Sequence, residues 1–150
     1  MDLLTQLNAY SARFARLLFA AHPEWQALAA AEPWPDAEPG CFAVVVPSPG
    51  DPAQALTVTT DGGEVTVAFG EQGWHTHFGS WTGADETTSF AQALAEVAGI
   101  LAGRRVLAVC DRGGRRGSVA ELLDAGTAPD LGGCERLTIH SWAGSRPAVA

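Results

Sequence analysis

His75 and His77, separated by a single threonine, are the residues whose types and spacing are best suited to chemistry. They lie in a run that alternates apolar and polar residues, so both imidazoles project from one face of a predicted strand. Imidazole nitrogens are common zinc ligands, and two of them on one face can share a divalent metal ion. A catalytic site needs a third ligand, which Glu64, Asp85 or Glu86 could supply. The spacing therefore allows a metal-dependent enzyme or a small-ligand binder centred on the two histidines.

A surface that binds another protein is the interpretation that we favour for the same histidines. The neighbouring predicted strands place threonines and a glutamate on the histidine side, and one solvated face is common in antiparallel sheets. A tryptophan follows in the next loop, and tryptophan is enriched among the residues that dominate protein interfaces. The predicted partner-binding residues are His75, His77, Thr57, Thr59, Glu64, Trp81, Asp85 and Glu86. A divalent metal at His75 and His77, and a homodimer formed through this face, stay open as alternatives.

This polar face is positioned by three consecutive antiparallel strands predicted within residues 56–78. Val65, Val67 and Phe69 alternate with polar residues, so these three side chains face the core. Pairing Phe69 with Trp74 across a glycine-bounded loop brings the apolar faces of the last two strands together. A slip of one residue would place the valines on the histidine face, so the pattern specifies this register.

The hairpin before it turns at Asp61-Gly62-Gly63, a strong turn signal. A turn around Asp61-Gly62 and a turn around Gly62-Gly63 differ by two residues in register, so both keep the same faces. On the polar side, the meander pairs Thr66 with His77.

Helices and further strands are predicted around this meander. The first helix, over residues 2–21, begins at the capping residue Asp2 and carries an apolar stripe that includes Leu17. The central helix begins at Ser89, by a capping-box spacing, and stops at Gly103. The other predicted elements are a short helix from Pro23 with Trp25 and Leu28 inward, strands over 41–47, 106–110 and 135–142, a segment over 118–125 that fits either a strand or a short helix, and a loose tail after Gly144.

Hairpins with grouped rather than alternating helices indicate the α+β class. We expect a single α+β domain over residues 1–150, with an antiparallel β-meander sheet of about five to six strands and the N-terminal and central helices packed on one face. The hydrophobic fraction of 47% is enough for a core and argues against disorder. The net charge of −8 argues against nucleic-acid binding and suits a basic protein partner.

The cysteines are odd in number and widely spaced, at Cys41, Cys110 and Cys134. They form no CxxC pair, so the pattern favours reduced thiols over a disulfide framework or a cysteine zinc site. No segment is long and apolar enough to span a membrane, and the N-terminal segment lacks the pattern of a signal peptide. We therefore expect a cytoplasmic protein.

Two further groups of residues have types that occur in functional sites. The glycine-rich turn Arg112–Arg116 carries arginines that can bind phosphate, but it lacks the lysine of a P-loop and lies in an acidic chain. We interpret it as a solvated turn. Cys110 could act as a nucleophile only beside a base such as His140, and we expect a buried structural thiol instead.

The runs GEVTVAF, GWHTHF, SFAQALAEV and ERLTIHSWAG resemble small bacterial immunity-type proteins associated with polymorphic or contact-dependent toxins. The resemblance extends over roughly residues 60–145. It implies a non-enzymatic protein that binds and neutralises a cognate toxin. An acidic surface would speed association with a basic toxin domain.

Overall fold

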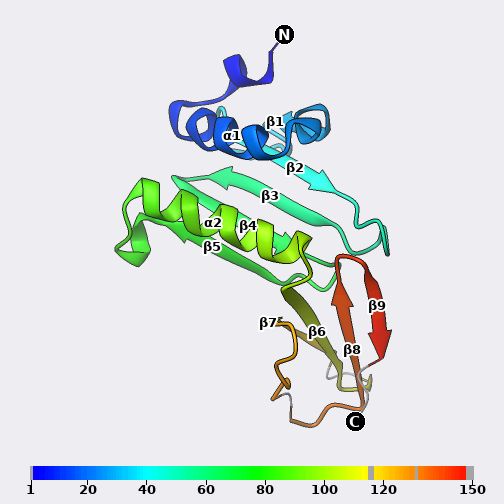
Figure 1. Ribbon diagram of the computed structural model, residues 1–150. Coiled ribbons are helices and arrows are strands. Elements are labelled where there is room, and N and C mark those ends of the chain that lie inside the picture. Colours follow the sequence, from blue (N-terminus) through cyan, green and yellow to red (C-terminus); the bar gives the residue numbers. More distant parts are fainter. Residues whose placement is uncertain (1, 115–116, 131, 148–150) are drawn as a thin grey trace. The chain divides into compact units, whose positions relative to one another are not determined.

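The computed structural model describes residues 2–114, 117–130 and 132–147. Within these ranges the chain is α+β, with an antiparallel sheet of five strands and another of four, and with helices packed on the sheet (Figure 1). The predicted class is confirmed, although the strands are more numerous than expected and form two sheets.

The chain divides into two compact units. The first comprises the residues up to Val46, Thr57–Val67 and Thr76–Ala95, and the second Pro47–Leu56, Ala68–His75 and the residues from Glu96 onward. The single domain stays a prediction.

The larger sheet has the strand order β1-β2-β3-β4-β5. Its strands are β1 (Ala29–Ala31), β2 (Phe42–Val46), β3 (Leu56–Asp61), β4 (Glu64–Phe69) and β5 (His75–Gly79). The predicted strand over 41–47 and the predicted meander are confirmed. The edge strand β1 was not predicted, because three alanines carry no β-branched or alternating signal. They pair antiparallel with β2.

Alternation along β3 and β4 is as predicted. Every second residue of each strand is buried, and the residues between them are half-buried until β3 reaches the exposed Asp61. The turn lies at Gly62 and Gly63, whose φ angles of 56° and 77° suit the hairpin turn that needs two left-handed residues. The amide of Phe69 donates to the carbonyl of Trp74 at 3.4 Å, in agreement with the predicted register.

The N-terminal helix is divided, so the prediction of one helix over 2–21 is wrong. A 3₁₀ helix, η1 (Leu3–Gln6), comes first, and Asp2 Oδ1 accepts from the amide of Leu4. Asn8 then caps α1 (Ala9–Ala21), because its Oδ1 accepts from the amide of Ser11 at 2.9 Å. Asparagine competes for backbone hydrogen bonds and therefore favours a cap over a helix interior.

The buried face of α1 also differs from the predicted stripe. Phe14 and Leu18 are fully buried, whereas Leu17 is 47% exposed. The ring of Phe14 contacts the rings of Phe42 on β2 and Phe90 on the next helix. In LLFAA, apolar residues surround the helix on all sides, so tertiary contacts decide which of them face the core.

Buried hydroxyls also join α1 to the larger sheet. The hydroxyls of Ser11 and Thr60 lie 2.6 Å apart, and Thr60 Oγ1 also accepts from the amide of Phe42. The helix is followed by η2 (Pro23–Leu28), with Trp25 buried as predicted and Leu28 exposed against prediction.

The central helix starts earlier than predicted. After η3 (Ser80–Thr82), α2 runs over Glu86–Leu101. Asp85 precedes it and accepts from the amide of Thr88 at 2.7 Å, so this carboxylate caps the helix in place of Ser89. The predicted stop is confirmed, since Gly103 has a positive φ of 69°.

The second sheet has the order β7-β6-β8-β9. Its strands are β6 (Arg105–Asp111), β7 (Ser118–Asp124), β8 (Arg136–Ser141) and β9 (Gly144–Pro147). The strands predicted over 106–110 and 135–142 are confirmed, and the ambiguous segment 118–125 is a strand. The prediction of a loose tail is wrong for residues 145–147, because β9 pairs antiparallel with β8, and residues 148–150 lie outside the described residues.

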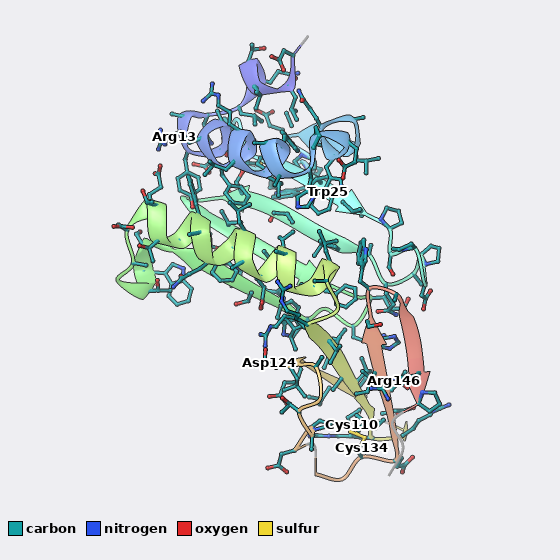
Figure 2. The ribbon with its side chains drawn as sticks, in the orientation of Figure 1. Arg13, Trp25, Cys110, Asp124, Cys134 and Arg146 are labelled. Carbon is teal, nitrogen blue, oxygen red and sulfur yellow. A yellow bond between two sulfur atoms is a disulfide. The ribbon has the colours of Figure 1, made fainter. Side chains whose placement is uncertain are left out.

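The prediction of reduced thiols is wrong for two of the three cysteines. Cys110 on β6 and Cys134 form a disulfide, with Cα atoms 5.4 Å apart (Figure 2). Cys41 is free and buried. The last pair of the β6–β8 ladder is Asp111 with Arg136, and Cys134 lies two residues before Arg136, in the loop that leads into β8. No helix among the described residues has the length and apolar character needed to cross a membrane.

Candidate functional site

Glu64 is the centre of the candidate site in the first unit. One carboxylate oxygen, Oε1, lies 2.9 Å from Nδ1 of His77, and the other, Oε2, accepts from Nε1 of Trp81 at 3.1 Å. The hydroxyl of Thr66 is also 2.9 Å from Nδ1 of His77. The predicted cross-strand neighbours Thr66 and His77 are therefore in contact, and strand pairing places one predicted carboxylate beside one predicted histidine.

Trp81 is the most exposed large apolar side chain recorded among the described residues, at 67%. It belongs to the short helix η3, which follows directly after β5. Its indole N–H bond to Glu64 holds the ring in one orientation although most of its surface faces solvent. An aromatic ring held in this way is suited to act as an interface anchor.

The other predicted carboxylates are engaged at the start of α2. Hydrogen bonding from Thr88, through its side chain and its amide, lowers the pKa of Asp85. Glu86 accepts from Arg13 of α1 at 2.6 and 2.9 Å, and this pairing lowers the pKa of Glu86. Figure 2 labels Arg13 on α1. Asp85 and Glu86 both follow β5, as the sequence predicts, but Asp85 bonds to Thr88 and Glu86 bonds to Arg13.

The two histidines have different surroundings. Nδ1 of His75 lies 2.8 Å from the carbonyl oxygen of Gly73, so this nitrogen donates its proton to the backbone. Among the residues that the structure describes, no three His, Cys, Asp or Glu side chains gather closely enough to hold a metal ion. A metal at His75 and His77 stays a prediction.

Thr57 and Thr59 are half-buried residues of β3, on the face that alternates with its buried residues. They complete the predicted polar face. Among the eight predicted residues, Glu64 contacts both His77 and Trp81 directly.

A cavity of about 230 Å³ in the same unit was not predicted. It is lined by Tyr10, Gly63, Gly79, Ser80, Glu86 and Ser89. Burial raises the pKa of Tyr10 to about 12, with the carboxylates of Glu86 and then Glu64 adding to the effect. The one available sequence signal was the phenol of Tyr10 on an otherwise apolar stripe, since a buried tyrosine hydroxyl needs a partner.

The contacts of Cys110 and His140 do not support a nucleophilic site. His140 lies on β8, which pairs with β6, the strand of Cys110. Cys110, however, is in the disulfide, and Nδ1 of His140 lies 2.5 Å from the hydroxyl of Ser145. In the basic turn, Arg115 and Arg116 lie outside the described residues.

Comparison with known proteins adds no relative. The chain matches no protein-family model, and no curated protein and no solved structure is similar enough to it to count as a match.

Proposed function

We propose that this chain is a non-enzymatic protein-binding module that neutralises a cognate bacterial toxin. The observation that carries the binding function is Trp81, which is 67% exposed and yet held by its hydrogen bond to Glu64. A side chain that is already oriented loses less conformational entropy when a partner covers it. Tryptophan is also the residue type most enriched among interface hot spots.

The charge of the chain supports a basic partner. Its net charge is −8, and the proposed surface contributes Glu64, Asp85 and Glu86 to it, with Glu64 bonded to the exposed indole. Complementary charge accelerates association and disfavours acidic competitors. The toxin enters the proposal through the resemblance of residues 60–145 to immunity-type proteins, which also supports a cytoplasmic site of action.

Binding is tested with the products of the genes that flank the gene for this chain, and a basic product is tested first. We expect a stable complex by calorimetry, and protection of growth when both proteins are expressed. Trp81→Ala should weaken the complex by about 2 kcal/mol or more, roughly thirtyfold. Leu28→Ala is the matched control, since Leu28 is also exposed and lies in a different helix of the same unit. Absence of a complex, or equal affinity of Trp81→Ala and the wild type, contradicts the proposal.

The alternative function is a metal-dependent enzyme or small-ligand binder. It is favoured by the contact between Glu64 and His77, which joins two ligand types on neighbouring strands. Elemental analysis of untagged protein tests it, beside the double variant His75→Ala/His77→Ala. One equivalent of metal in the wild type that is lost in the variant would favour this alternative over protein binding.

A further inference from the structure

Two hydroxyl groups at the unpredicted cavity have no hydrogen-bond partner among the described residues. They are the phenol of Tyr10 and the hydroxyl of Ser89, both at wall residues of the cavity. Ser89 is only 1% exposed. Native proteins rarely leave buried hydroxyl groups without partners. The cavity therefore has polar groups ready for a hydrogen-bonding ligand.

The charge around the cavity favours a cation. Glu86 is in its wall. The pKa of Tyr10 is raised to about 12, first by burial and then by the carboxylates of Glu86 and Glu64, and the opposing effect of Arg13 is the smallest of the four. The field at the phenol is thus negative although Arg13 is paired with Glu86. A carboxylate has about four lone-pair positions, so Glu86 can accept from Arg13 and from a second donor together.

An anion is disfavoured at the same place. The cavity adjoins the start of α2, and a helix N-terminus attracts negative charge. That end already has two carboxylates, from Asp85, which accepts from the amide of Thr88, and from Glu86. An incoming anion would meet Glu86 in the cavity wall.

We propose that this cavity is a socket for a primary ammonium group, the end of a lysine side chain on the protein partner. An ammonium has three donors and no acceptor, and Tyr10, Ser89 and Glu86 provide three oxygens that can accept. Its compact, rotatable donors suit three separate acceptors better than the planar fork of a guanidinium does. This inference rests on the proposed function, because it names the partner chemistry recognised beside Trp81.

The probe is n-butylammonium chloride, titrated into the isotopically labelled protein at constant ionic strength. We expect saturable shifts of the amide resonances of Gly63, Gly79 and Ser89. Tyr10→Phe and Ser89→Ala each remove one oxygen and should raise the Kd about tenfold, the usual effect of losing a hydrogen bond to a charged group. Thr87→Ala is the matched control, because it removes an exposed hydroxyl from the same helix. Well-dispersed spectra establish that each variant is folded.

Three compounds separate the competing ligands. These are n-butanol, which has the same chain without charge, ethylguanidinium and acetate. Saturation by butylammonium in preference to all three supports the socket. Equal binding of n-butanol, tighter binding of ethylguanidinium or acetate, or no saturable shift at all, as expected for a cavity that holds water, overturns it.

The outcomes distinguish this inference from the function on which it rests. If butylammonium saturates the cavity and no basic protein forms a complex, the socket is supported and the proposed function fails. If a complex depends on Trp81 and is unaffected by Tyr10→Phe and Ser89→Ala, the proposed function is supported and the socket fails. If both are right, these two variants weaken the protein complex about tenfold, as they weaken butylammonium.

Discussion

The first unit and the second sheet differ in the side chains that pack in them. The core of the first unit contains the contacting rings of Phe14, Phe42 and Phe90, which come from two helices and a strand. The second sheet has an aliphatic cluster of smaller side chains instead: Val106, Ala108 and Ile139, with Leu123 and Leu137 packed against it. Aromatic side chains bury far more area than alanine or valine, so the second sheet gains less from apolar burial.

Covalent and ionic cross-links also join segments of the second unit. Cys110 and Cys134 join β6 to the loop before β8, and Arg105 pairs with Glu96 and Asp124. In the first unit the cysteine is free, and Arg13 pairs with Glu86. The first unit buries every second residue of β3 and β4, so the polar residues between them contribute little to its apolar packing.

The largest expected effect is in the aromatic core. Phe14→Ala should lower the free energy of unfolding by about 3–5 kcal/mol, since it removes a fully buried ring with two aromatic contacts. Leu17→Ala, three residues further along the exposed side of α1, should cost less than about 1 kcal/mol. Urea denaturation measures both. Similar losses for the two variants would mean that α1 is packed as the sequence stripe suggested.

Removing the cross-link tests the second unit. The disulfide joins residues separated by 24 positions, and opening a loop of that size costs about 3 kcal/mol in the chain-entropy model. Cys110→Ser/Cys134→Ser should lose this stability, and dithiothreitol should produce the same loss in the wild type but none in the variant. An unchanged unfolding midpoint in dithiothreitol would contradict the comparison. Thiol trapping in cell extracts then tests the cytoplasmic proposal, because disulfides are rare in the cytosol.

The buried hydroxyl pair gives an intermediate effect. Thr60→Val removes the partner of the Ser11 hydroxyl and of the Phe42 amide, and should cost about 2 kcal/mol. The double variant Ser11→Ala/Thr60→Val should cost less than the sum of the single variants, because it leaves fewer unpaired groups. Urea denaturation of the wild type, the two single variants and the double variant measures the coupling of the two hydroxyls in a double-mutant cycle. Strict additivity would show that the two hydroxyls do not interact.

Acid should weaken the second unit to a smaller extent. Burial lowers the pKa of His140, although the carboxylates of Asp51 and Glu71 oppose this. The unfolded chain therefore binds a proton more readily than the folded one, so stability is complete above the unfolded pKa of about 6.5 and declines as the pH falls below it. Unfolding of the wild type and of His140→Gln at neutral and mildly acidic pH measures the effect. If His140→Gln keeps the full pH dependence of stability, groups other than His140 cause that dependence.

The sequence predicted the meander well because side-chain alternation is a local property. Two residues on neighbouring strands, Thr66 and His77, were placed in contact from spacing alone, and their side chains are 2.9 Å apart. The turn glycines and the stop at Gly103 were equally local signals.

Several of the errors concern contacts between distant parts of the chain. The exposure of Leu17 depends on which side of α1 meets β2, and the disulfide depends on the pairing of β6 with β8. The cavity needs Tyr10 from the first helix and Ser89 from the central one. No spacing rule brings these residues together, so the cavity could not be predicted from the sequence.

The burial of Cys41 has a practical consequence. With the other two cysteines joined, the single thiol of the oxidised protein is fully buried, and burial raises its pKa, which disfavours the reactive thiolate. A maleimide dye should therefore label the native protein only when the start of β2 opens. The rate of labelling reports the opening of the first unit, without any engineered probe, and a bound partner that stabilises this unit should slow it.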